Sequence, residues 1–220
     1  MLNDAILADY ASGALPSGMS LLVAAHLTFS PEGRARVAGF EAIGGVLLED
    51  ADQNGPDVAP PSLADALALL DALAPMPEHE PTIACGACAD APDIDSVMPT
   101  CLRKALGVCE HDAPWRFRLP GLAEAVLEKF EGEELSLLRA RPGAPMFSHT
   151  HDGVEATLVL CGALEDRGRI YRRGDVAIAT AADDHRPRIL DEGVCICFIV
   201  TTGKMRFTGP FSRALNYLAE

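Results

Sequence analysis

Hydrophobic residues in the first 75 positions recur every three to four residues, the spacing of one face of an α-helix. Four such segments are separated by proline, glycine or polar residues, and each starts at a residue type that favours a helix N-terminus. The predicted helices begin at Asn3 or Asp4, at Pro16 or Ser17, at Ser30, and at Ser62. The first ends near Gly13, the third reaches Leu48 before a break at residues 51–61, and the fourth stops at Pro75. The pattern therefore predicts a small N-terminal helical bundle over residues 1–75.

The hydrophobic pattern changes after about residue 100. Short apolar or alternating runs now follow one another, and glycines recur between them, as in antiparallel sheets. The predicted strands cover residues 115–119, 125–130, 135–140, 155–161, 168–171, 175–180 and 194–201. Many short strands with frequent turns indicate a sandwich or small barrel over residues 100–220, with a short helix in the terminal RALNYLAE. The predicted fold class is α+β with more than one domain.

Residues 76–99 are rich in proline and in small or acidic residues, which is typical of a linker. One motif stands apart there, Cys85-Gly-Ala-Cys88. This spacing suits two thiolates on one zinc ion, or a redox pair. A lone CxxC also fits ordinary reduced cysteines at the surface, so both interpretations stay open.

The overall composition is that of a globular chain. With 220 residues, 49% of them hydrophobic, it can bury real cores. No apolar run approaches the roughly 20 residues that span a bilayer, and the N-terminus lacks the basic and apolar regions of a signal peptide. Seven cysteines without an export signal favour reduced thiols or metal ligands over a disulfide framework. We expect a cytoplasmic protein.

Negative charge is concentrated at the N-terminal end. Residues 1–80 hold 12 acidic side chains against only Arg34 and Arg36, and the net charge of the chain is −14. Such a surface repels phosphate backbones, which argues against direct nucleic-acid binding, and it attracts a basic protein. Solubility alone would also explain the charge. Four apolar helix positions fit either a core or an interface: Val23, Leu27, Ile43 and Val46.

Three potential metal donors, His149, His151 and Glu155, fall within seven residues. Alternate residues of a strand project to the same face, so both histidines can point into a barrel, and Glu155 can join them from the same side. His185 lies 30 residues after Glu155, where a neighbouring antiparallel strand can carry it to the same cluster. Three imidazoles and one carboxylate suit zinc, with iron, manganese and nickel as alternatives.

The spacing of these donors resembles the cupin family. The first cupin motif is matched position by position, at Gly143, His149, His151, Glu155 and Gly162. Gly174 followed by His185 has the spacing of the second motif, whose usual Pro, Gly and Asn are Thr180, Ala182 and Ile189 here. The resemblance implies a C-terminal cupin-type antiparallel β-barrel over residues 100–220, with the four donors on its metal. Many cupins pair, so a homodimer through this domain is a further expectation.

The whole chain resembles the ChrR-type anti-sigma factors, in which a small helical domain precedes a cupin-like domain. The likeness runs from Asp4 through the stretch from His26 to Val46 and on to Val194-Cys-Ile-Cys197. It implies that the helical domain binds an extracytoplasmic-function sigma factor and hides the surfaces that meet RNA polymerase and promoter. The cupin domain would sense an oxidative or chemical stress signal and release the sigma factor.

The helical part departs from that family at its usual zinc motif, His-x-x-x-Cys-x-x-Cys with an upstream histidine. Ser30 and Gly33 occupy the two cysteine positions, and no histidine precedes His26. A single remaining ligand does not hold zinc. Either the helices pack without metal and His26 is a partly buried core residue, or Cys85 and Cys88 supply replacement ligands. The intact apolar pattern favours the first.

Two functions from different classes follow from the same donors. One is a regulatory binding protein; the other is a metal-dependent cupin enzyme, such as a dioxygenase or isomerase, with iron, manganese or nickel. An enzyme needs an acid or base beside the metal, but the neighbours along the donor strand are Thr157, Val159 and Cys161. We therefore predict a regulator and not an enzyme.

Cys195 and Cys197 face the same side of an apolar strand, and Cys161 can lie near them. We hypothesise that oxidation of one of these thiols, or of a metal-bound imidazole, loosens the barrel and weakens its hold on the partner. Inert buried cysteines are the alternative.

Overall fold

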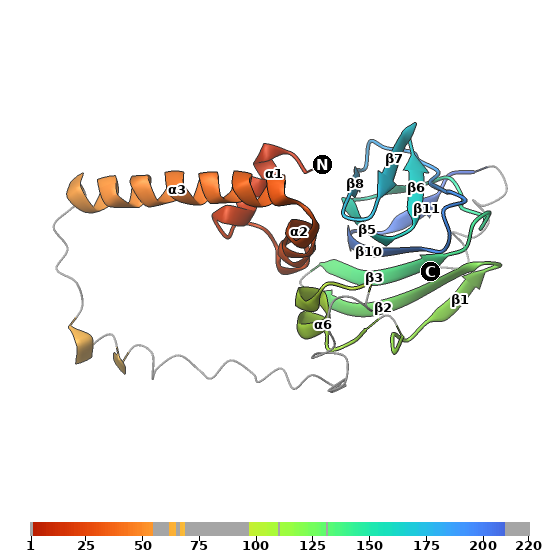
Figure 1. Cartoon of the computed structure of the whole chain (residues 1–220), viewed down its shortest axis with the longest axis horizontal. Helices are drawn as coiled ribbons and strands as arrows, with labels where there is room; N and C mark the ends of the chain where they lie inside the picture. The colour runs from red at the N-terminus through yellow and green to blue at the C-terminus, as the bar shows by residue number, and fades with distance from the viewer. Residues whose placement is uncertain are drawn as a thin grey trace.

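The computed structural model describes residues 2–54, 62–64, 67–68, 97–109, 111–130 and 132–209. N-terminal helices are followed by antiparallel sheets, which confirms the α+β fold class (Figure 1). The helices are α1 (Asp4–Ala11), α2 (Ser17–Phe29), α3 (Pro31–Asn54) and α6 (Thr100–Leu106). Of the helix predicted from Ser62, residues 63–64 and 67–68 are helical and residues 69–75 lie outside the described part of the chain.

Local capping explains where α1 starts. The side chain of Asn3 accepts a hydrogen bond from the amide of Ile6 at 3.0 Å, which confirms the first predicted cap. Two helical predictions were wrong. Helix α3 continues to Asn54, through the first four residues of the break predicted from residue 51. Helix α6 was not expected, although Pro99 precedes it and Gly107 ends it in the left-handed conformation, at φ 62°.

The strands form one large and two small antiparallel sheets. They are β1 (Arg116–Leu119), β2 (Leu122–Phe130), β3 (Glu133–Ala140), β4 (His149–His151), β5 (Glu155–Cys161), β6 (Ala163–Asp166), β7 (Arg169–Arg172), β8 (Val176–Ala179), β9 (Arg188–Ile189), β10 (Cys195–Thr202) and β11 (Met205–Phe207). The large sheet has the order β1-β2-β3-β10-β5-β8, and the small sheets are β11-β4 and β7-β6-β9. The sequence pattern missed the short strands β6, β9 and β11.

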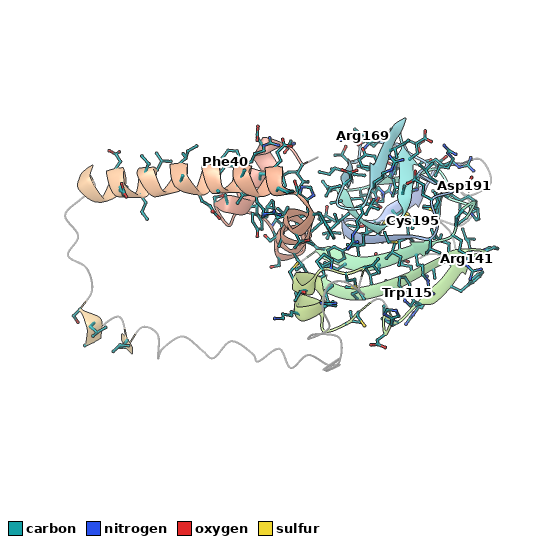
Figure 2. All side chains as sticks on the ribbon, in the orientation of Figure 1. Phe40, Trp115, Arg141, Arg169, Asp191 and Cys195 are labelled. Carbon is teal, nitrogen blue, oxygen red and sulfur yellow. The ribbon has the colours of Figure 1, made fainter. Side chains whose placement is uncertain are left out.

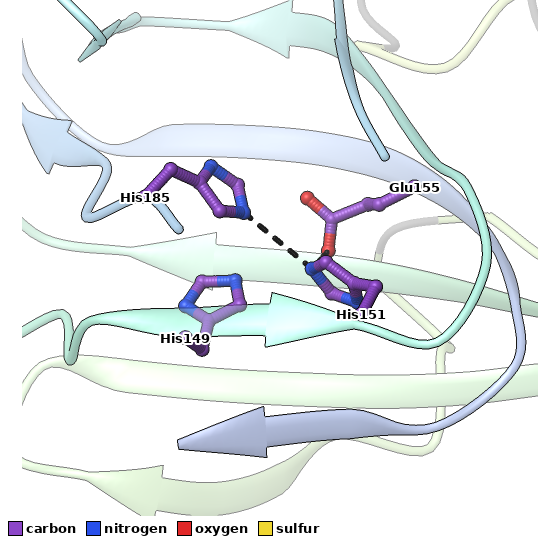
Figure 3. Close-up of side chains that lie close together, drawn as sticks. All are labelled: His149, His151, Glu155 and His185. Carbon is purple, nitrogen blue, oxygen red and sulfur yellow. Dashed lines mark hydrogen bonds and ion pairs between the residues drawn. The ribbon is translucent and has the colours of Figure 1, made fainter. Parts of the chain in front are cut away.

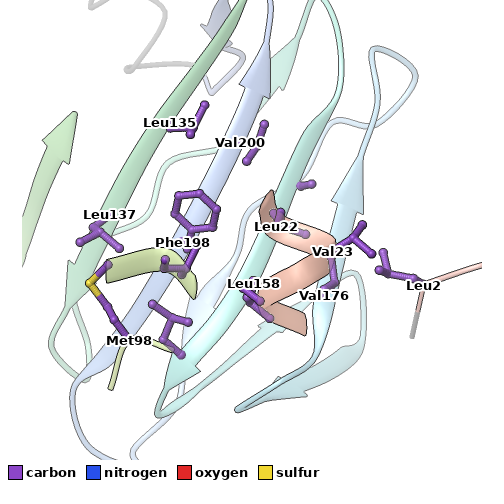
Figure 4. Close-up of a cluster of buried hydrophobic side chains, with 14 of the residues drawn as sticks. Leu2, Leu22, Val23, Met98, Leu135, Leu137, Leu158, Val176, Phe198 and Val200 are labelled. Atoms are coloured by element: carbon purple, nitrogen blue, oxygen red, sulfur yellow. The ribbon is translucent and has the colours of Figure 1, made fainter. Parts of the chain in front are cut away.

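The two faces of the large sheet bury different cores. One face meets the small sheets, with Val159, Leu164 and Cys197 in a common cluster. The other face packs against α2 and α6, so that Leu22 and Val23 share a core with Leu158 (Figure 4). The helices and the sheet are therefore joined by one continuous apolar core.

The four apolar helix positions that fit either a core or an interface differ in their burial. Val23 is fully buried and Leu27 packs partly buried against the shared core. Ile43 and Val46, in contrast, are 58% and 64% exposed. From Glu41 onward every described side chain of α3 is exposed, because the helix extends beyond the elements on which its start is packed (Figure 1).

Several predictions fall on residues outside the described ranges. These are the linker at residues 76–99, apart from residues 97–99, the Cys85–Cys88 pair and the C-terminal helix. The domain boundaries near residues 75 and 100 stay predictions. None of the helices in the described ranges is long and apolar enough to cross a membrane.

Candidate metal centre

Two strands that are consecutive in the sequence, together with one isolated β-bridge, bring the four donors together. His149 and His151 lie on β4, and Glu155 opens β5 after a tight turn. The turn requires Gly153, because a Cβ there would stand 1.9 Å from the carbonyl oxygen of Thr202. His185 forms an antiparallel bridge with His149, with both backbone N–H···O distances at 3.0 Å. This placement confirms the predicted convergence of the four residues.

The spacing of the donor atoms fits a metal ion. One ligand atom from each of the four residues lies within 4.8 Å of the others. Nε2 of His151 lies 3.4 Å from Nε2 of His185 and 3.2 Å from Oε2 of Glu155 (Figure 3). Zinc–ligand bonds of about 2.0–2.1 Å in a tetrahedron place neighbouring ligand atoms about 3.3 Å apart. These two contacts have the length of such tetrahedron edges, and the whole set spans up to 4.8 Å.

Hydrogen bonds outside the cluster orient two of the imidazoles. Nδ1 of His149 donates to the carbonyl of Phe147 at 2.8 Å, and Nδ1 of His185 donates to Oδ2 of Asp166 at 3.1 Å. A proton on Nδ1 leaves the lone pair of Nε2 free for a cation, a tautomer inferred from these partners. Thr157 donates to Oε1 of Glu155 at 3.1 Å. These contacts fix the orientation of three of the four side chains.

Burial and neighbouring charge set the protonation of the cluster. His151 is 2% exposed, and this burial lowers its pKa, which favours the neutral imidazole that a metal requires. Burial also lowers the pKa of His185, but the bond and charge of Asp166 outweigh it and raise that pKa. Burial raises the pKa of Asp166, and His185 with Arg167 reverse this effect and hold it below its usual value.

Asp166 and Arg167 are positioning residues that sequence reasoning missed. Asp166 ends β6 and is 3% exposed, and Arg167 adopts a left-handed conformation at φ 48°. The guanidinium of Arg167 bonds to Asp166, to Asp183 and to the carbonyl of Ile178. An acidic residue at the end of a strand was the available signal, but most such residues face solvent in turns.

The donor set could hold a divalent ion and suits one chemically. Nε2 of His151 faces the cluster, whereas its Nδ1 is buried without a hydrogen-bond partner among the described residues. Three neutral imidazoles and one carboxylate leave a divalent ion with a net charge of about +1. The four described donors therefore fit a metal ion.

The predicted thiols lie in the core between the large sheet and the small sheets. Sγ of Cys195 is 3.7 Å from Sγ of Cys197, and both residues are 1% exposed. The hydrogen bond between them lowers the pKa of Cys195 and, with burial, raises that of Cys197 well above its usual value. The two thiols share one face as expected, and their oxidation stays a prediction.

The residues at the positions of the usual zinc motif, His26, Ser30 and Gly33, make hydrogen bonds and packing contacts in this chain. His26 is 3% exposed and its Nδ1 donates to the carbonyl of Gly174 at 2.7 Å. Ser30 caps α3 by accepting from the amide of Gly33 at 3.0 Å. A Cβ on Gly33 would meet Ser30 Oγ at 2.9 Å, so these two positions touch without metal. The metal-free interpretation fits this geometry.

Comparisons with known proteins identify the family. Residues 104–205 match the family described as the ChrR cupin-like domain. The anti-sigma-E factor ChrR of Cereibacter sphaeroides is 34% identical over 208 residues, which cover 94% of this chain and 91% of that protein. This chain belongs to the ChrR family. The ChrR relative is an anti-sigma factor and not an enzyme, which supports the predicted regulator over the cupin enzyme.

The family likeness extends to solved structures. The crystal structure of Rhodobacter sphaeroides SigE in complex with the anti-sigma ChrR matches with a TM-score of 0.69 and 29% identity. The match covers 91% of this chain and 97% of that one. An RmlC-like cupin protein of Ralstonia eutropha matches with a TM-score of 0.41 and 23% identity, over 50% of this chain and 84% of that one. Most of this ChrR-family chain therefore shares the architecture of a ChrR protein.

Proposed function

We propose that this chain is an anti-sigma factor that sequesters an extracytoplasmic-function sigma factor and releases it when the cupin part responds to a stress signal. Family membership over 94% of the chain supports this function. So does the structural likeness to ChrR as it occurs in its complex with SigE, at a TM-score of 0.69. Cytoplasmic location and cupin pairing stay predictions.

The exposed half of α3 carries the proposal. Beyond Phe40 the helix stands clear of the sheets (Figure 2). It presents four apolar side chains that are between 58% and 73% exposed, Ile43, Val46, Leu47 and Leu48. Adjacent large apolar side chains in solvent are typical of an interaction site. We name Ile43, Val46, Leu47 and Leu48 the α3 apolar surface.

The negative charge around the α3 apolar surface favours one class of protein partner. Glu41, Glu49 and Asp50 lie beside the α3 apolar surface, and residues 1–80 hold 12 acidic against two basic side chains. Complementary charge steers association, so this surface suits a partner with a basic face. A sigma factor has such a face where it otherwise meets DNA, which makes it a fitting partner.

The test is binding to the extracytoplasmic-function sigma factors of the source organism. We expect one of them to co-purify with the full chain and to lose transcription activity in its presence. Leu47→Ser should weaken the affinity for the sigma factor about tenfold or more, since it removes an apolar side chain that the complex would bury. Ala38→Ser, at an exposed and uncharged position of α3 outside the α3 apolar surface, is the matched control and should change affinity much less. Failure of every sigma factor to bind would refute the function.

We propose zinc as the metal of His149, His151, Glu155 and His185. The tetrahedron-like separations of 3.2 and 3.4 Å support this choice, as does the nitrogen-rich donor set. Bound zinc would supply a cross-link between β4, β5 and the segment that carries His185. The polar neighbours Thr157 and Asp166 are engaged in holding the ligands, which is consistent with a structural or sensing centre.

A further inference from the structure

Helix α2 is capped by a residue of the sheet and not by its own neighbour. Pro16 precedes the helix and makes no side-chain cap. The amides of Gly18 and Met19 instead donate to the carboxylate of Glu133, at 2.8 and 3.2 Å. Glu133 opens β3 and is 5% exposed. A buried carboxylate thus meets the positive end of the helix dipole, the position where a negative charge is most favourable.

Helix and strand are in direct contact at this end. A Cβ on Gly18 would stand 2.8 Å from Cδ1 of Leu135 and 2.9 Å from Oε2 of Glu133. Both are closer than real Cβ contacts, and the carboxylate cannot move without breaking its bonds to the helix. The absence of a side chain at Gly18 therefore lets the first turn of α2 pack directly on β3.

The other end of α2 is held by a turn of the cupin part. His26 donates from Nδ1 to the carbonyl of Gly174 at 2.7 Å. Gly174 has φ +89°, and a Cβ there would stand 2.7 Å from Cβ of Phe29. The guanidinium of Arg173 lies over the Phe29 ring, 5.1 Å from its centroid. The last turn of α2 therefore has polar and apolar contacts with this turn.

The same turn is bonded to the strand of the metal centre. The amide of Gly174 donates to the carbonyl of Val159 at 2.8 Å, and the amide of Val159 donates to the carbonyl of Asp175 at 3.0 Å. Val159 lies on β5, whose first residue is Glu155. The carbonyl that holds His26 is therefore fixed to the strand that carries a metal donor.

We propose that Glu133 and Gly174 form a two-ended clamp on α2, and that opening this clamp frees α1, α2 and the start of α3 from the sheet while the cupin strands stay folded. The helices keep contacts of their own, including the ion pair of Arg36 with Asp4, so they can move as a unit. Use of this opening to release a sigma factor rests on the proposed function, whereas the clamp itself does not.

Hydrogen exchange on the full chain tests the clamp. Gly18→Ala places a methyl group against Leu135 and Glu133, and Gly39→Ala is the matched control, since a Cβ at Gly39 meets no atom within 4 Å. We expect Gly18→Ala to speed amide exchange in α1 and α2 about tenfold or more, with β3, β5 and β10 unchanged. Gly39→Ala should leave both regions at the wild-type rate or slower.

Glu133→Gln provides a second and milder opening of the clamp. It keeps the shape of the side chain and removes the charge at the helix N-terminus, so exchange in α1 and α2 should rise severalfold. If Gly18→Ala fails to fold, exchange in Glu133→Gln still tests whether the clamp holds the helices on the sheet. Unchanged exchange in the helices of the folded variants would overturn the proposal. An equal rise in the helices and in the three central strands would also overturn it, because it would show that they unfold only together.

Discussion

Asp166 accepts a hydrogen bond from Nδ1 of His185 across 3.1 Å, and each side chain is 3% exposed. The bond holds the imidazole with Nε2 facing His151, at 3.4 Å. Carboxylates behind metal-binding histidines fix ring orientation and increase ligand basicity. Asp166 therefore belongs to the candidate metal centre, although it is not one of its four donors.

Asp166→Asn should weaken zinc binding by about tenfold or more, because it removes the negative charge behind His185. Competition with a zinc-binding dye would measure the change in dissociation constant. Asp191→Asn is the control, since Asp191 is exposed and lies outside the cluster. Equal affinities of Asp166→Asn and the wild type would show that Asp166 does not tune the site.

His149→Ala and His185→Ala should each abolish stoichiometric metal binding, because each removes one of four ligands. Elemental analysis of the purified chain should give about one zinc per wild-type chain and almost none in either variant. Two zinc ions, of which one survives both substitutions, would point to a second site at His26 or at Cys85 and Cys88. Iron, manganese or nickel in place of zinc would contradict the proposed metal and return the enzyme to consideration.

Leu158→Ala should lower the free energy of unfolding of the chain, because Leu158 is fully buried in the core between the helices and the large sheet. Loss of a buried leucine side chain costs about 2–5 kcal/mol of unfolding free energy. Urea denaturation followed by circular dichroism would measure it. Leu48→Ala removes the same atoms from a side chain that is 73% exposed, and it should change stability by less than about 0.5 kcal/mol.

His26 should make the chain less stable in mild acid. Burial lowers its pKa below 6.5, and its bond to Gly174 and the charge of Asp175 oppose this shift only in part. The folded chain therefore binds a proton at His26 less readily than the unfolded chain does. The stability from neutral His26 is complete above pH 6.5 and is lost as the pH falls toward the lowered folded pKa.

His26→Gln isolates this contribution. Unfolding free energies of wild type and variant, measured from about pH 7 to about pH 5, should converge as the pH falls, with the steeper loss in the wild type. Comparison of the two chains cancels the other titrating groups, including His151. Parallel curves would contradict the assigned role of His26.

The clustering of the four donors was predictable from sequence because most of its geometry is local. His149 and His151 alternate along one strand, so a shared face follows from backbone geometry alone. The position of His185 needed one further assumption, an antiparallel neighbour, and the bridge to His149 confirms it. Asp166 was missed because no local pattern tells a buried acid at a strand end from an exposed one.

Contacts between distant segments were also beyond sequence reasoning. Glu133 caps α2 from 115 residues away, so nothing near Gly18 in the sequence reveals the cap. Helix α6 was missed for a different reason. Its signals, Pro99 before it and Gly107 after it, enclose only seven residues, too few to show a helical period clearly.

By itself the sequence determined the change from a helical to a strand-rich part and the set of four clustered donors, because hydrophobic period, caps and alternation act over a few neighbouring residues. Only the tertiary structure decided which apolar helix positions form the core. Val23 and Val46 belong to similar helical stripes, yet Val23 is fully buried and Val46 is 64% exposed. The difference depends on where the sheet lies, and burial of apolar area against a distant surface is not encoded in the local period.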